Sequence, residues 1–181
     1  MNCRPVTTES LDDLTHFSEE HGKFRYCSCM RWRMRSKDYR EAGKDGRVAA
    51  LQMMVEAGIP VGVLGYVAGE PVGWCSMAPR ETYRGLQHSR VLPPLEGDSV
   101  WSVVCFFLDR GCRRRGAMLD LLKGAVAYAR SQGAHTVEGY PAEPGAGLYR
   151  FMGAIAAFEA AGFRDVTPAG QRRRVMRLAL D

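Results

Sequence analysis

The chain has 181 residues, of which 46% are hydrophobic and 25% are charged. This length suits a single domain with one sizeable core, and the ordinary composition excludes a disordered chain. No apolar run approaches the roughly 20 residues of a membrane helix, and the N-terminal residues lack the apolar core of a signal peptide, so we expect a cytoplasmic protein without a membrane partner. The formal net charge of +5 favours an anionic partner.

The first half of the chain is predicted to form a strand, two helices and a β-hairpin. In chain order we expect a strand at 3–6, a helix from Thr8 or Ser10 to about His21, an irregular segment rich in Arg, Met and aromatic residues at 23–40, a helix after Asp45 that stops at Gly58, and hairpin strands at 61–67 and 71–77. Thr and Ser are good N-caps, Gly ends helices, and Ala68-Gly69-Glu70 is a hairpin turn signal.

The second half is predicted to alternate strands and helices after a long, turn-rich connection. In order, the elements are the connection at 79–97, a buried strand at 100–108, an amphipathic helix that continues to about Arg130, a strand at 136–140, a helix at 148–161 and a last strand near 174–180. No internal repeat or linker indicates a domain boundary, so residues 1–181 are expected to form one domain.

The connection between the strand at 100–108 and the next helix has the properties of a phosphate site. Arg113, Arg114, Arg115 and Gly116 form a basic turn at the start of the helix. Free main-chain N–H groups and the positive end of the helix dipole attract an anion there, and glycine allows close approach. The alternative is a solvated arginine cluster at the start of an ordinary surface helix.

In this context the run Arg113-Arg114-Arg115-Gly116-Ala117-Met118 resembles the R/Q-x-x-G-x-G/A signature of the GNAT superfamily of acyl-CoA-dependent N-acyltransferases, with Met118 in place of the last small residue. The stretches Glu70-Pro71-Val72-Gly73-Trp74 and 154–163 also resemble segments of that family. The resemblance implies an α/β (α+β) GNAT fold, which is a mixed, mostly antiparallel sheet with a V-shaped splay, flanked by helices.

The resemblance also implies the activity and its cosubstrate. We expect an N-acetyltransferase that passes an acetyl group from acetyl-CoA to the primary amine of a small molecule by direct attack, without a metal. The main chain of Phe106, Phe107 and Leu108 is expected to bind the pantetheine arm. The CoA pyrophosphate is assigned to Arg113, Arg114, Arg115, Gly116, Ala117 and Met118. A homodimer is left open.

The acid and base of the reaction are where this sequence departs from the family pattern. The tyrosine that protonates the thiolate in this family falls at Phe158, which has no proton to donate. Tyr149 and Tyr140 are nearby substitutes. Glu138 is the leading base, since a carboxylate flanked by apolar residues can have a raised pKa. A solvated residue or a structural ion pair is the alternative for Glu138.

The acceptor is expected to bind between the two irregular connections. Arg31 and Trp32 come from the first connection, and Trp74 and Arg80 from the end of the hairpin. Arginines beside aromatic rings suit a small amine that also carries a carboxylate. Solvated surface arginines are the alternative.

The six cysteines are expected to be reduced thiols. Cys27 and Cys29, with His16 and His21 upstream, leave open a zinc site, a reactive thiol pair or simple packing.

Three other functions compete with acetylation of a small molecule. They are a nucleic-acid-binding module, a CoA-binding regulatory module without catalysis, and a protein or peptide N-acetyltransferase. No helix shows a continuous basic face, so we expect no nucleic-acid partner.

The phosphate assignment predicts the effect of changing the turn. Arg113→Ala should raise the KM for acetyl-CoA by about tenfold, because a charge-assisted bond to phosphate is worth at least about 1.4 kcal/mol. Gly116→Val should have a larger effect, since its side chain would obstruct the phosphate. Unchanged CoA binding in both variants, measured by calorimetry, would refute the assignment.

Overall fold

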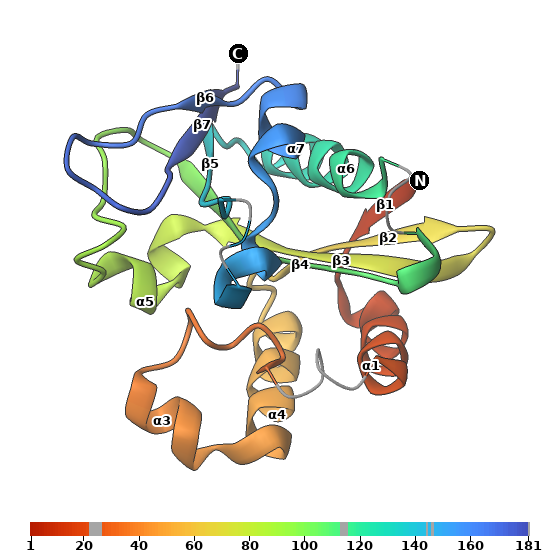
Figure 1. Ribbon diagram of the computed structural model, residues 1–181. Coiled ribbons are helices and arrows are strands. Elements are labelled where there is room, and N and C mark those ends of the chain that lie inside the picture. The colour runs from red at the N-terminus through yellow and green to blue at the C-terminus, as the bar shows by residue number, and fades with distance from the viewer. Residues whose placement is uncertain (22–26, 113–115, 144, 146, 181) are drawn as a thin grey trace.

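The computed structural model describes residues 1–21, 27–112, 116–143, 145 and 147–180 (Figure 1). In this part of the chain the strands form one seven-stranded sheet of order β1-β2-β3-β4-β5-β7-β6. Strands β4 and β5 are parallel, and the other neighbouring pairs are antiparallel. The strands are β1 (Asn2–Pro5), β2 (Gly62–Val67), β3 (Glu70–Pro79), β4 (Val100–Leu108), β5 (Thr136–Gly139), β6 (Arg164–Asp165) and β7 (Met176–Ala179). The predicted mixed, mostly antiparallel sheet flanked by helices is confirmed.

Helices cover both faces of the sheet (Figure 1). On one face lie α6 (Ala117–Ser131) and α7 (Ile155–Ala160), and on the other lie α1 (Leu11–Glu20), α3 (Ser36–Glu41) and α4 (Gly43–Glu56). The short α5 (Arg84–Gln87) lies in the connection between β3 and β4. The 3-10 turns are η1 (Thr8–Ser10), η2 (Arg80–Thr82), η3 (Arg110–Cys112) and η4 (Gly147–Met152). Within the described residues, no helix is both long and apolar enough to cross a bilayer.

Helix α6 packs closely on the sheet because the contact positions are small or aliphatic. Its buried residues, which recur with helical spacing, are Ala117, Leu121, Leu122, Ala125, Val126 and Ala129. A Cβ added to Gly124 would lie 2.4 Å from Cys3, and one added to Gly73 would lie 2.8 Å from Leu108. Gly124 therefore allows α6 to approach β1, and Gly73 leaves room for the side chain of Leu108.

The pairing of β4 changes halfway along the strand. Its ladder with β3 runs from Trp101 to Leu108, whereas its ladder with β5 covers only Val100–Val103. The β3 ladder also has a bulge at this point, because Ser76 pairs with Cys105 while Met77 pairs with Val103. β4 therefore continues beyond the end of β5. The gap left beside this part of β4 is the opening that a V-shaped splay requires.

Three predicted segments differ from the structure. The continuous helix predicted at 148–161 is wrong: it is divided into η4 and α7, since Gly153 has φ +98° and Ala154 is extended. A Cβ at Gly153 would also lie 2.8 Å from Phe158. The connections predicted as irregular contain α3 and α5, because both helices are too short to show a clear period.

The contact between β5 and α7 predicts the effect of a larger residue on stability. A Cβ added to Gly139 would lie 2.1 Å from a ring carbon of Phe158. Gly139→Ala should therefore lower the free energy of unfolding by about 1–3 kcal/mol, as overpacked cores do. Urea denaturation measures this loss, and Phe158→Leu should partly relieve it in the double variant. An unchanged unfolding midpoint for Gly139→Ala would contradict the contact.

Candidate active site

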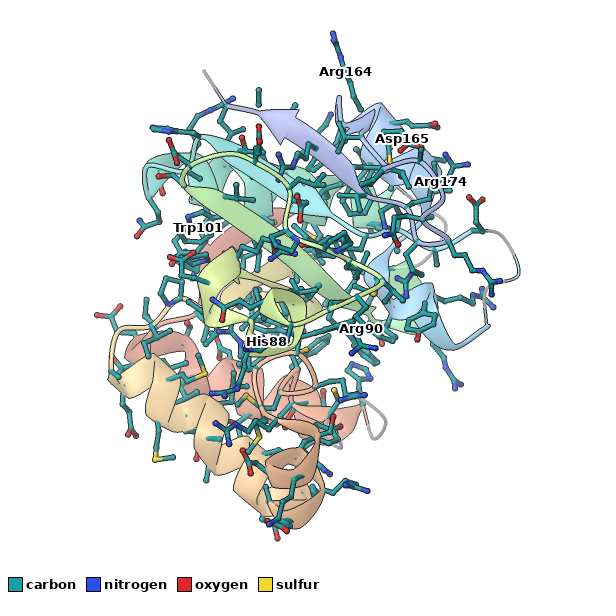
Figure 2. All side chains as sticks on the ribbon, turned by 90° about the vertical axis from the view of Figure 1, so that its left-hand side faces the viewer. His88, Arg90, Trp101, Arg164, Asp165 and Arg174 are labelled. Carbon is teal, nitrogen blue, oxygen red and sulfur yellow. The ribbon has the colours of Figure 1, made fainter. Side chains whose placement is uncertain are left out.

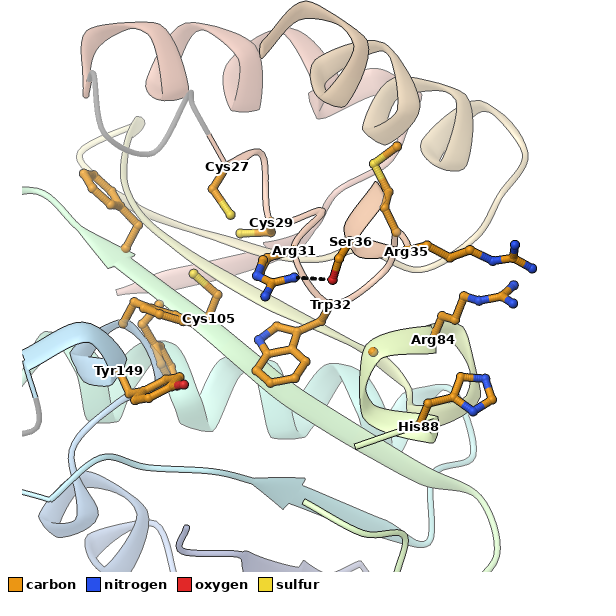
Figure 3. Close-up of a pocket in the computed structure, with 15 residues that line it drawn as sticks. Cys27, Cys29, Arg31, Trp32, Arg35, Ser36, Arg84, His88, Cys105 and Tyr149 are labelled. Atoms are coloured by element: carbon orange, nitrogen blue, oxygen red, sulfur yellow. Dashed lines mark hydrogen bonds between the residues drawn. The ribbon is translucent and has the colours of Figure 1, made fainter. Parts of the chain in front are cut away.

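A cavity of about 880 Å³ lies beside the second half of β4 (Figure 3). Four segments that are far apart in the sequence form its wall: the segment 27–36, the region of α5, β4 and η4. The lining residues are Cys27, Cys29, Arg31, Trp32, Met34, Arg35 and Ser36 from the first segment, Arg84, Gly85 and His88 from the second, Cys105, Phe106 and Phe107 from β4, and Tyr149 and Phe151 from η4.

Main-chain contact joins two of these walls. The Gly85 N–H donates to the Trp32 carbonyl oxygen at 2.7 Å. A Cβ on Gly85 would lie 3.0 Å from that oxygen, so glycine suits this close approach. Arg31 is held over the cavity by a hydrogen bond from its Nη1 to Ser36 Oγ at 3.4 Å (Figure 3). The positions of the basic residues are therefore set by local contacts as well as by the fold.

The residues predicted to bind CoA fall into three groups. Phe106 and Phe107 line the cavity, whereas Leu108 and Ala117 are buried and Met118 packs against the core. Gly116 precedes α6 with φ +74°, and a Cβ there would meet nothing within 4 Å. No described side chain caps α6, so its first N–H groups are suited to an anion. Arg113, Arg114 and Arg115 lie outside the described residues.

Glu138 is fully buried in a structural network away from the cavity. Its Oε1 accepts from Arg80 Nε at 3.1 Å and from the Tyr140 hydroxyl at 2.5 Å, and its Oε2 accepts from Arg177 Nε at 2.7 Å. Glu138 thus forms the structural ion pairs that are the alternative for this residue, and it is not among the residues that line the cavity. Its role as a general base stays a prediction.

The same network accounts for two other predicted site residues. Tyr140 is buried, and burial, followed by the negative charge of Glu138, raises the pKa of its hydroxyl far above the usual range. Arg80 donates from Nη2 to the Leu92 carbonyl oxygen at 3.0 Å in addition to its ion pair. Neither residue is among those that line the cavity. Arg80 holds the connection between β3 and β4 through Leu92, and Tyr140 contacts β4 through the Ser102 hydroxyl at 2.9 Å.

Trp74 also lies behind the cavity wall and not on it. The side chain is fully buried, and its Nε1 donates to Cys29 Sγ at 3.0 Å. Of the four residues predicted to bind the acceptor, the structure therefore brings Arg31 and Trp32 to the cavity, whereas Trp74 and Arg80 support it from behind.

The aromatic residues near η4 have different surroundings. Tyr149 lines the cavity and is 42% exposed, with the Arg173 guanidinium 3.9 Å from its ring centre. Phe158 is fully buried and meets the rings of Phe106 and Phe163 at 6.0 and 4.9 Å. Phe158 is therefore part of the core, and Tyr149 is the tyrosine of the predicted set that lies at the cavity.

Several lining residues are not predicted by the sequence. Arg84 and His88 are four positions apart around α5, a spacing that places side chains on one helix face, but the helix itself is not apparent from the sequence. Cys105 lies within an apolar run and resembles ordinary core. Among the described residues, no group of three or more His, Cys, Asp or Glu is arranged to hold a metal ion.

The network predicts that Glu138→Gln mainly changes stability. Removing the charge leaves Arg80 and Arg177 without a buried counterion, and breaking buried pairs in this way typically costs about 3–5 kcal/mol. The free energy of unfolding from urea denaturation should fall by this order.

A matched control is Glu143→Gln, whose partner Arg174 is exposed and also pairs with Asp165 (Figure 2). Exposed pairs contribute little, so this variant should be indistinguishable from wild type. Equal losses in both variants would contradict the assigned role of Glu138.

The comparisons with known proteins agree with this geometry. Residues 26–154 match the model of the acetyltransferase (GNAT) family. One solved structure with the same fold is a ribosomal-protein-alanine N-acetyltransferase from Brucella melitensis, with 17% identity, a TM-score of 0.55 and an alignment that covers 99% of this chain and 100% of that one. Another is the paia N-acetyltransferase from Thermoplasma acidophilum in complex with coenzyme A, with 11% identity, a TM-score of 0.56 and coverage of 99% of this chain and 98% of that one. A third is AAC(6')-Ib in complex with ribostamycin and coenzyme A, with 15% identity, a TM-score of 0.58 and coverage of 98% of this chain and 92% of that one. No curated protein matches the chain. Because the family model covers more than half of its residues, the chain belongs to the GNAT acetyltransferase family and is an acyltransferase.

Proposed function

We propose that this acyltransferase moves an acetyl group from acetyl-CoA to the primary amine of a small molecule that also carries a carboxylate or another anion. One observation carries the proposal. The cavity beside β4 is lined by basic and aromatic side chains, and no carboxylate is among its described lining residues.

The cofactor half of the proposal rests on β4 and α6. The cavity borders Phe106 and Phe107, where β4 has passed the end of its β5 ladder. The N-terminus of α6 follows at Gly116, and among the described residues no side chain caps it, so its N–H groups are suited to the diphosphate of a nucleotide cofactor. Structural neighbours of this chain are complexes with CoA, which supports the same cosubstrate here.

The acceptor half rests on the charges of the cavity. Arg31, Arg35, Arg84 and His88 line it, and Figure 3 shows Arg35 and Arg84 extending toward the same side as His88. Guanidinium groups bind carboxylates well and repel cations. We therefore expect an amine that carries an anionic group, and we expect a polycationic amine to be a poor acceptor.

The lining residues also suggest how protons move. His88 lines the cavity and is our candidate to accept the proton of the amine. The neutral amine then attacks the thioester carbon, and a main-chain N–H of β4 stabilises the oxyanion. Tyr149 lies at the cavity and is our candidate to protonate the departing CoA thiolate.

The cytoplasmic location of the protein and its assembly into a homodimer stay predictions.

Acceptor charge gives a direct test. Against a panel of amino acids, their amides and polyamines, with acetyl-CoA as donor, kcat/KM should be highest for the carboxylates. Arg31→Ala combined with Arg84→Ala should raise the KM for the carboxylate acceptors by about tenfold, the equivalent of about 1.4 kcal/mol, and should leave the KM for amides nearly unchanged.

Arg164→Ala is the matched control, since Arg164 is an exposed arginine that extends into solvent away from the cavity (Figure 2). A wild-type enzyme that prefers polyamines, or equal effects of the cavity and control variants, would overturn the acceptor assignment. Absence of any stabilisation by acetyl-CoA in thermal unfolding would overturn the cofactor assignment.

A further inference from the structure

His21 and Asp109 form a contact between α1 and the end of β4. His21 is the residue that follows the last turn of α1, and Asp109 directly follows β4. The His21 Nε2 lies 3.6 Å from Asp109 Oδ2, which is an ion-pair distance for a protonated imidazole. The two side chains are 24% and 35% exposed, so solvent screens the pair only in part. Neither residue is among the described residues that line the cavity.

The imidazole of His21 belongs to an aromatic cluster that joins α1 to β4. Its ring centre lies 4.7 Å from that of Phe17 and 5.3 Å from that of Phe107. The Phe17 and Phe107 rings also contact each other, at 5.7 Å. Phe17 is fully buried, and Phe107 lines the cavity. Packing therefore holds the imidazole beside the end of β4, where its nitrogen meets Asp109.

Asp109 in turn organises the start of the connection to α6. Its Oδ1 accepts the Gly111 N–H at 2.6 Å, and its main-chain carbonyl accepts the Cys112 N–H at 3.2 Å. Its own N–H donates to the Val72 carbonyl oxygen at 2.9 Å, which ties it to β3. One carboxylate thus shapes the turn η3 with one oxygen and meets His21 with the other.

The charge of Asp109 is unfavourable for the ligand expected at this connection. The proposed function places a diphosphate at the N-terminus of α6, to which η3 leads. Asp109 is the only carboxylate in the sequence 109–118. Charges of the same sign repel over about 10 Å at an ionic strength of about 0.1 M. The carboxylate that shapes the turn therefore opposes the diphosphate unless a cation offsets it.

We propose that His21 is a positioning residue for the CoA diphosphate. It holds the Asp109 carboxylate where the turn needs it, and its positive charge offsets that of the carboxylate. This inference rests on the proposed use of acetyl-CoA. Because His21 acts through Asp109, it affects the affinity for the cosubstrate and leaves the transfer step and the acceptor unaffected.

His21→Ala should raise the KM for acetyl-CoA and the Kd for CoA by about three- to fivefold, the range for a partly exposed ion pair. The kcat at saturating acetyl-CoA and the KM for the acceptor should stay as in wild type. Calorimetric titration with CoA at an ionic strength of about 0.01 M measures the loss, and the difference from wild type should shrink at about 1 M. His21→Lys keeps a positive charge and should recover most of the affinity.

A second-site change separates charge from packing. Asn at position 109 can still accept the Gly111 N–H but carries no charge. Asp109→Asn alone should bind CoA at least as tightly as wild type, and in the His21→Ala background it should restore the lost affinity. Asparagine cannot replace the imidazole against Phe17 and Phe107, so a role in packing alone would show no such rescue.

The matched control is His16→Ala, since His16 pairs with Glu20 at 3.4 Å on an exposed part of the same helix. This variant should bind CoA as wild type does. Wild-type affinity in His21→Ala, or a loss that Asp109→Asn does not restore, would overturn the role of His21 and leave the proposed function intact. If CoA does not bind the wild-type protein at all, the proposed function fails and this inference fails with it.

Discussion

The ion-pair network around Glu138 is the interaction on which the geometry of the site depends. The carboxylate lies in β5 and is bonded to Arg80 at the end of β3 and to Arg177 in β7. Through Arg80 Nη2 it also holds the Leu92 carbonyl, and through Arg177 Nη1 the Glu96 carbonyl at 2.5 Å. The connection that carries the basic wall of the cavity is therefore fixed from behind by one buried anion. Loss of that anion would leave the buried Arg80 and the partly buried Arg177 without their counterion, a change that typically costs about 3–5 kcal/mol.

Arg33 is a second buried arginine, and its charge is compensated in a different way. Arg80 is compensated by a carboxylate, whereas Arg33 donates to three neutral oxygen atoms and lies over the Tyr83 ring, 4.3 Å from its centre. Two of the residues that hold Arg33, Thr82 and Tyr83, follow Arg80 closely in the connection between β3 and β4. Both arginines therefore help to hold this connection in place. The same physical constraint, that a buried charge needs compensation, thus links the stability of the fold to the position of the cavity wall.

The sequence predicts those parts of the fold that depend on local pattern. The strand at Val100–Leu108 has the predicted bounds, since a continuous apolar run is typical of a central strand, and the helical period of α6 is equally clear. The environment of Glu138 could not be predicted, because Arg80 and Arg177 are 58 and 39 residues away in the chain. The strand at 136–140 could be predicted, but not that two arginines meet its glutamate. Arg84 and His88 were missed for a similar reason, since only the folded connection brings α5 to the cavity.

The central claim is that acetyl-CoA binds along β4 with its sulfur in the cavity, next to the basic acceptor wall. A crystal structure of the protein with CoA tests this most directly. The account predicts that the pantetheine arm follows Phe106, Phe107 and Leu108, that the pyrophosphate meets the N-terminus of α6 at Gly116, and that the CoA sulfur enters the cavity between Cys29 and Tyr149. A CoA molecule bound elsewhere, or one whose sulfur points away from this cavity, would contradict the account.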